Sequence, residues 1–116
     1  MNIDNILKRA FEVRRAFEEK KVDEKELSRL YFEYNPIEEV QRFISEAKEL
    51  FPHLNCGIAS VYLKKVFSQG KIIQGKYKQN NHTFLLLEES IIVDITSDQY
   101  GGPSVYVGRL VKPWEI

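Results

Sequence analysis

Apolar residues in the first half of the chain recur with the period of amphipathic helices. Over residues 3–17, with Arg, Glu and Lys between them, the apolar positions of one helical face are Ile3, Ile6, Leu7, Ala10, Phe11 and Phe17. A second helix is expected to start at Asp23, whose carboxylate can cap it. Its inward residues are then Leu27, Leu30 and Tyr31.

The third predicted helix has the clearest start pattern. Asn35 stands at the expected N-cap, Pro36 at the first helical position and Glu38 at N3, where side chains satisfy amides that a helix leaves unpaired. A fourth helix is predicted to begin near Cys56 and to be closed by Gly70.

After Gly70 the period changes from that of helices to that of strands. Residues 71–77 alternate weakly, residues 83–87 and 91–95 are solid apolar runs, and residues 105–107 form the last predicted strand. The polar residues 88–90 predict a hairpin between the second and third strands. The chain is therefore expected to be an α+β domain with N-terminal helices packed on a small antiparallel sheet.

Composition and charge narrow the class of protein. The chain has 116 residues, 43% of them hydrophobic, and no repeat or linker divides it. We expect a single domain over 1–116, with a helical part at 1–52 and a part at 53–116 that consists of one helix and antiparallel strands. Seventeen basic residues balance seventeen acidic ones, which argues against nucleic-acid binding. No apolar run approaches the roughly 20 residues of a membrane span, so no membrane partner is expected and the cytoplasm is the default location.

A single cysteine limits the possible chemistry. Cys56 has no partner for an intramolecular disulfide, and with two histidines it cannot form a zinc-finger ligand set, so we expect no metal and no other cofactor. At a helix start, the macrodipole and unpaired amides would favour its thiolate and could stabilise an oxyanion. The alternative is that Cys56 is a small buried hydrophobe.

Two further polar residues stand in the apolar strands. His82 precedes the most apolar run, and Asp94 lies inside the next one, where a buried carboxylate is costly unless it is paired. A hairpin that turns about Glu89 would place Asp94 opposite His82 on the neighbouring strand, to within one or two residues. Asp94 could then orient the imidazole. Alternatively, Asp94 caps a loop amide and His82 is merely exposed. Together with Cys56, the two residues make a complete set of catalytic roles.

These residues carry a resemblance to a known superfamily. The segments N-C-G-x-A-S at 55–60, N-H-T-F-L-L-L-E at 81–88 and I-V-D-I-T-S-D at 92–98 resemble the core of transglutaminase-like and papain-like cysteine enzymes. In the transglutaminase-like branch the histidine strand commonly reads H-x-W-x-E and is followed by D-x-T or D-P-T. The resemblance covers residues 52–107, and it implies that Cys56 is the nucleophile, His82 the general base and acid, and Asp94 the orienting residue.

The chain also departs from the superfamily pattern. Phe84 stands where the tryptophan after the histidine is usual, and the papain-type glutamine that donates to the oxyanion has no counterpart before Cys56. Oxyanion stabilisation then falls to the Cys56 amide and a second donor, for which Asn55 and Gln99 are the side-chain candidates. Asn55 is alternatively a plain helix cap.

Structural roles are expected for several other residues near the candidate site. His53 stands three residues before Cys56, too close in one loop to align with the thiol, and we expect a surface residue. Trp114 is expected to be a packing anchor. The polar residues 96–102 either form one wall of a substrate groove or a turn that satisfies its own hydrogen bonds.

The favoured function is an enzyme that attacks an amide, ester or thioester carbonyl and forms an acyl-enzyme, with a peptide or small acyl compound as substrate. The alternative is a non-catalytic module that binds a protein partner on the N-terminal helices. Exposure of Phe11 and Phe17 would support that alternative. A third possibility is a redox-sensing thiol, which needs no Asp94.

Overall fold

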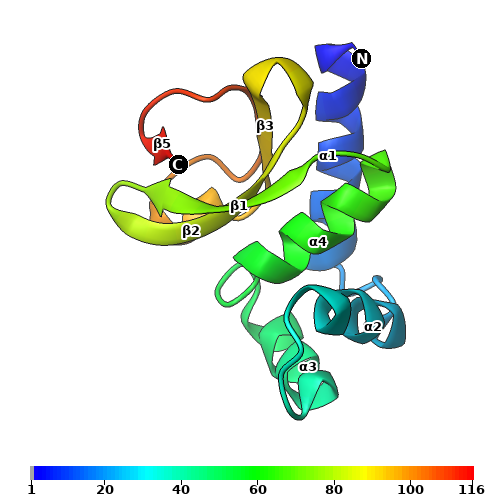
Figure 1. Ribbon diagram of the computed structural model, residues 1–116. Coiled ribbons are helices and arrows are strands. Elements are labelled where there is room, and N and C mark those ends of the chain that lie inside the picture. The colour runs from blue at the N-terminus through cyan, green and yellow to red at the C-terminus, as the bar shows by residue number, and fades with distance from the viewer. Residues whose placement is uncertain (1) are drawn as a thin grey trace.

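The computed structural model describes residues 2–116, apart from the side chain of Glu89. Within this range four α-helices precede a five-stranded antiparallel sheet that is strongly curled (Figure 1). The helices are α1 (Ile3–Glu18), α2 (Glu24–Tyr34), α3 (Val40–Leu50) and α4 (Cys56–Phe67). The strands are β1 (Lys71–Tyr77), β2 (Asn80–Leu86), β3 (Ile91–Asp94), β4 (Tyr106–Arg109) and β5 (Trp114–Glu115), in the spatial order β4-β3-β2-β1-β5. The predicted α+β class is confirmed.

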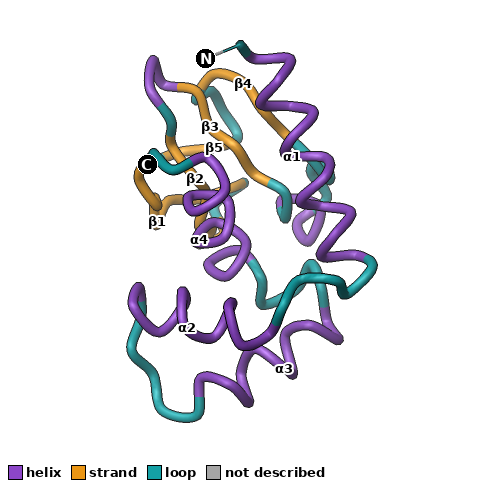
Figure 2. Tube along the Cα trace, turned by 90° about the vertical axis from the view of Figure 1, so that its right-hand side faces the viewer, coloured by secondary structure: helices purple, strands orange, loops and turns teal. Residues whose placement is uncertain are grey.

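Helix α4 forms the middle layer of the molecule. It contacts β2, β1 and β3 on one side and α2 on the other, and α2 packs against α3 (Figure 2). Helix α1 runs beside β4, at the far edge of the sheet. Because protein covers α4 on two sides, apolar residues occupy more than one of its faces. The buried ones are Ile58, Ala59, Val61 and Leu63.

The second and fourth helices begin where the sequence predicts, but the third does not. The Asp23 carboxylate accepts from the Lys25 amide and caps α2, and α4 begins at Cys56. Asn35, predicted to start the third helix, instead ends α2 in an extended conformation. A residue before proline is disfavoured in the helical region, so Pro36 acts here as a stop for α2. Helix α3 begins only at Val40.

The ends of other elements also differ from expectation. Ser68, with a φ of 56°, ends α4 in the left-handed conformation, so Gly70 is not the residue that closes this helix. Strand β1 has its predicted bounds, β2 begins earlier than expected at Asn80, and the two-residue strand β5 was not predicted. The early start of β2 follows from its pairing with β1 across a two-residue turn, and β5 exists because it pairs with the distant strand β1.

The hairpin turn between β1 and β2 fixes the register of the sheet. Lys78 and Gln79 both have positive φ, 48° and 70°, as a two-residue turn between twisted strands requires. The register pairs Gly75 with His82. The predicted β2–β3 hairpin is also present, with Leu85 opposite Val93. Continuing this register places Asp94 opposite Phe84. Because alternate residues of a strand point to the same face of a sheet, Phe84 and His82 lie on one face, which Asp94 shares.

The sheet divides the apolar residues into two clusters. The larger cluster lies between the sheet and the helices and includes Ile44, Ile58, Leu63, Leu85 and Val93. The smaller one covers the other face and consists of Tyr77, Phe84, Ile92 and Trp114, with partly buried neighbours. No helix of the described chain is both long and apolar enough to cross a membrane.

A buried arginine joins α1 to the segment that follows β3. The Arg14 guanidinium donates to both carboxylate oxygens of Asp98 at 2.8 Å and to the carbonyl of Ile95 at 2.7 Å. It also lies 4.7 Å from the ring centre of Phe51. Burial lowers the pKa of Arg14, but its hydrogen bonds to Asp98 and Glu18 outweigh this and raise it. The guanidinium therefore holds this segment as a permanent cation.

Replacing Arg14 by alanine should lower the free energy of unfolding by about 3 kcal/mol, because it leaves the Asp98 carboxylate without its buried partner. Urea denaturation followed by circular dichroism measures the change. Arg15, exposed on the same helix, is the matched control, and Arg15→Ala should cost less than about 0.5 kcal/mol. Equal effects of the two substitutions would mean that the Arg14 contacts do not stabilise the fold.

Candidate active site

Cys56 is the first residue of α4 and opens onto the end of the β1–β2 hairpin. It lines an open pocket of about 420 Å³ together with Gln74, Gly75, Asn81, His82 and Thr83. Asn55 occupies the N-cap position, but no described side chain caps the first turn of the helix. The thiol therefore lies at the positive end of α4, beside amides that a substrate oxygen can use.

His82 and Asp94 form a buried pair. Each is only 2% exposed, and His82 Nε2 lies 2.7 Å from Asp94 Oδ2. Because the carboxylate accepts at Nε2, the ring nitrogen left for the thiol is Nδ1. Among the described residues Nδ1 is buried and has no conventional hydrogen-bond partner, although the ring interacts with Cys56. The structure thus places all three predicted residues in one cluster.

The Asp94 carboxylate has three further donors. Trp114 Nε1 donates to Oδ2 at 2.8 Å. The Thr96 amide donates to Oδ1 at 2.9 Å, and its hydroxyl lies 3.4 Å from the same oxygen. Trp114 is therefore both the expected packing residue and a donor to the carboxylate, which the sequence analysis missed. The need for such a donor could be inferred from the sequence, since a carboxylate inside an apolar strand requires several hydrogen-bond donors.

The charges of the cluster support one another. Burial raises the pKa of the Cys56 thiol, but hydrogen bonding and the charge of His82, with hydrogen bonding from Thr83, outweigh it and lower the pKa below its ordinary value. Burial lowers the pKa of His82, but Asp94 and Cys56 outweigh it and raise the pKa to about 9. The positive charge of His82 thus favours the thiolate form of Cys56, and the negative charges of Cys56 and Asp94 favour the imidazolium form of His82.

Aromatic rings cover the buried pair. The Tyr100 ring meets the His82 ring edge-on at 5.5 Å, and the Tyr77 ring does so at 6.1 Å. Burial raises the pKa of Tyr100, and the negative charge of Cys56 raises it further. Burial and the charge of Asp94 act in the same way on Tyr77. These rings exclude water from the pair, which strengthens its electrostatic interactions.

Neither side-chain candidate for the oxyanion lies where it is needed. Both amide hydrogens of Asn55 are used, because Nδ2 donates to the carbonyls of Ala47 at 2.9 Å and His53 at 2.8 Å. Asn55 therefore fastens the loop before Cys56 and makes no side-chain cap. Gln99 does not line the Cys56 pocket, and its buried Nε2 has no partner among the described residues. His53 is exposed, as expected.

Residues 96–102 form a turn that is held partly by its own backbone hydrogen bonds. The Ser97 hydroxyl donates to the carbonyl of Pro103, and the amides of Gly101 and Gly102 donate to the carbonyls of Asp98 and Ser97. The segment is a turn, as one of the two interpretations expected, but the Asp98 carboxylate is paired with Arg14 and not with nearby amides. None of residues 96–102 is among those that line the thiol pocket. Tyr100 reaches the site from this turn, because its ring packs against His82 and its hydroxyl donates to the carbonyl of Asn81 at 3.2 Å.

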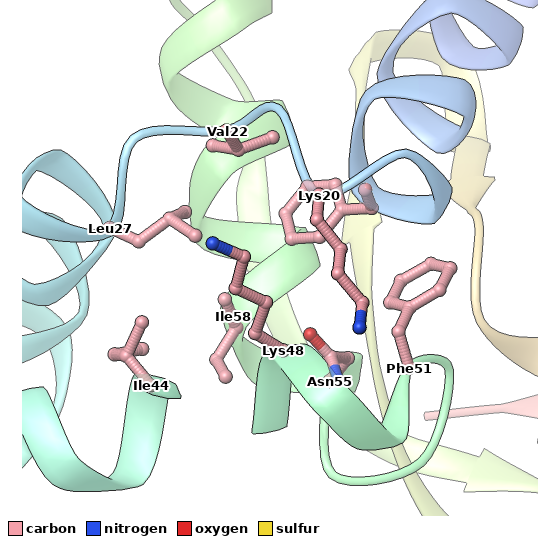
Figure 3. A pocket seen from close by; sticks show the side chains of 9 residues that line it. Lys20, Val22, Leu27, Ile44, Lys48, Phe51, Asn55 and Ile58 are labelled. Atoms are coloured by element: carbon pink, nitrogen blue, oxygen red, sulfur yellow. The ribbon is translucent and has the colours of Figure 1, made fainter. Parts of the chain in front are cut away.

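A small cavity lies between the helices, and Asn55 lines it but Cys56 does not (Figure 3). It is lined mostly by apolar side chains, with Lys20 and Lys48 beside it. Its volume of about 20 Å³ is room for roughly one water molecule. This cavity is a gap in packing and is too small for a substrate. In the described part of the chain no group of three or more His, Cys, Asp or Glu residues is arranged to hold a metal ion.

Comparisons with protein-family models, with curated proteins and with solved structures give no match to this chain. The resemblance to transglutaminase-like and papain-like enzymes therefore stays a prediction. The chemistry of the site is inferred from its own residues.

The lowered pKa of Cys56 predicts fast alkylation at acidic pH. At pH 6 iodoacetamide should label Cys56 about tenfold or more faster than free cysteine, and His82→Ala should abolish the difference. Intact mass measures the reaction unambiguously, because the chain has one cysteine. His53→Ala, which removes the other histidine, is the matched control and should change nothing. Labelling that follows an ordinary thiol in all variants would refute the activated thiolate.

Proposed function

We propose that the chain is a cysteine-nucleophile enzyme that acts on amide, ester or thioester carbonyls through an acyl-enzyme at Cys56. The observation that carries the proposal is the buried His82–Asp94 pair. Its remaining ring nitrogen has no hydrogen-bond partner among the described residues, and the ring interacts with a thiol at a helix start. An imidazole held by a carboxylate beside a nucleophile is the arrangement that acyl transfer requires. A papain-like or transglutaminase-like core is proposed with it.

Acylation begins with the thiolate of Cys56. Its sulfur attacks the carbonyl carbon, and the carbonyl electron pair moves onto oxygen, where the Cys56 amide can donate to it. When the intermediate collapses, the leaving group takes the proton from His82 Nδ1, and a thioester forms on Cys56. Asp94 accepts from Nε2 throughout, so that the ring keeps its orientation and the imidazolium is stabilised.

Deacylation uses the same groups in reverse. Neutral His82 takes a proton from water or an amine, which attacks the thioester and releases Cys56 as the thiolate. Water makes the enzyme a peptidase, amidase or deamidase, whereas an amine makes it an acyltransferase. An unpaired reactive thiol suits a reducing compartment such as the cytoplasm.

A second candidate function has one observation in its favour. Phe11 on α1 is 53% exposed, as a protein-binding surface on the N-terminal helices would require, but Phe17 is only 7% exposed and belongs to the core. A redox-sensing thiol is a third candidate, and it would not need the four donors that surround Asp94.

Asp94→Asn should leave the fold intact and lower turnover of an activated ester on the order of 10³- to 10⁴-fold, because the ring loses its orienting carboxylate. The assay is release of p-nitrophenol from p-nitrophenyl acetate, with the acetyl adduct on Cys56 detected by intact mass. Glu115→Gln, an exposed carboxylate on β5, is the control. Turnover that persists in Cys56→Ser, without an acyl adduct in the unmodified protein, would overturn the proposal.

The raised pKa of His82 predicts the alkaline limb of the pH profile. The reacting form needs protonated His82, so kcat/KM should rise with thiolate formation and fall to half near pH 9. In Asp94→Asn the residual activity should fall at lower pH, because the hydrogen bond to Asp94 is the largest of the interactions that raise the pKa of His82. If the alkaline limb of Asp94→Asn lies at the same pH as that of the unmodified protein, Asp94 does not raise the pKa of His82.

A further inference from the structure

We propose that the groove between α2, α4 and β1 binds the acyl side of an extended peptide substrate and selects an apolar side chain about three residues before the reacting carbonyl. This inference rests on the proposed acyl-enzyme chemistry and adds its substrate class. The groove has a volume of about 460 Å³, which is in the range of ligand sites. Its apolar lining comes from Leu30, Tyr34, Val61 and Ile72, and its charged lining from Glu33, Lys64 and Lys65.

The groove and the thiol pocket meet at one hydrogen bond. Tyr34 lines the groove and Gln74 lines the pocket, and Gln74 Nε2 donates to the Tyr34 hydroxyl at 2.7 Å. Helix α2 also packs on the first turn of α4, since a Cβ placed on Gly57, the residue after Cys56, would lie 3.3 Å from the Tyr31 ring. A chain leaving Cys56 along α4 therefore enters the groove.

The spacing along α4 sets the selected position. Val61 is five residues and Lys64 eight residues beyond Cys56, which is about 8 Å and 12 Å along a helix that rises roughly 1.5 Å per residue. An extended peptide covers about 3.4 Å per residue. The groove therefore receives the side chain of about the third residue from the carbonyl.

The direction of the groove assigns it to the acyl part. Ile72 in the groove, Gln74 at the junction and Gly75 beside His82 follow one another along β1, so the groove extends away from His82. His82 protonates the leaving group and marks that side of the pocket. What lies in the groove is then the part that stays attached to Cys56.

Polar groups along this route favour a peptide over a hydrocarbon chain. The Gln74 carboxamide and the Tyr34 hydroxyl stand at the junction and can pair with peptide amides. Within the described strands β5 pairs with β1 only at Lys76 and Tyr77, so residues 71–75 keep one unpaired edge. A bound peptide can satisfy such groups, whereas a fatty chain would leave them unpaired.

The test compares covalent probes on the single cysteine. N-acetyl-tripeptidyl chloromethyl ketones alkylate the thiolate with loss of chloride, and they differ only in carrying Leu, Gly or Asp at the third residue from the ketone. We expect the Leu probe to react with Cys56 about tenfold or more faster than the Gly probe. Leu30→Glu should abolish this preference, and Phe32→Glu, an exposed apolar residue of the same helix outside the groove, should keep it.

Iodoacetamide separates the two hypotheses, since it is too small to reach the groove. Fast labelling at pH 6 with equal rates for the three peptides would overturn the groove and leave the proposed function standing. Slow labelling at pH 6 would overturn the proposed function and the groove with it. If a hexanoyl chloromethyl ketone reacts with Cys56 faster than the Leu peptide does, the groove binds a fatty chain, and the proposal of a peptide substrate is wrong. The probe series on the unmodified protein is decisive even if Leu30→Glu does not fold.

Discussion

The negative charge of Asp94, buried inside the sheet, is the constraint to which the rest of the site conforms. A carboxylate that is 2% exposed is stable only when its oxygens are hydrogen-bonded. The donors come from three separate segments: His82 on β2, Thr96 after β3 and Trp114 on β5. The register of β2 and β3, the turn after β3 and the position of β5 all have to satisfy this single group.

What the sequence could predict was carried by local patterns. Asp94 between apolar neighbours and His82 before an apolar run are visible in a few residues each, and the short polar connection at 88–90 allowed their registers to be counted. The start of α4 at Cys56 was predicted in the same way. The prediction that a helix starts at Asn35 and Pro36 was wrong, because this pair of residues fits the end of one helix as well as the start of another.

What the sequence could not predict depends on how far the sheet curls and where helices cross. Trp114 reaches Asp94 only because β5 pairs with β1, and the bond from Gln74 to Tyr34 joins residues forty positions apart. Asn55 was expected to serve a helix or a substrate. Instead it binds the carbonyls of Ala47 and His53, a choice made by the bend of the chain between α3 and α4.

The Arg14 contacts extend the reach of the site to the first helix. Arg14 fixes Asp98 and the carbonyl of Ile95, on either side of the Thr96 amide that binds Asp94. Most buried thiols react with alkylating agents only when the fold opens locally. The proposed site predicts the opposite order, because an opening that separates Cys56 from the His82 ring would make the sulfur a weaker nucleophile at acidic pH. The single cysteine would then report local opening of the native state by a decrease in its reactivity.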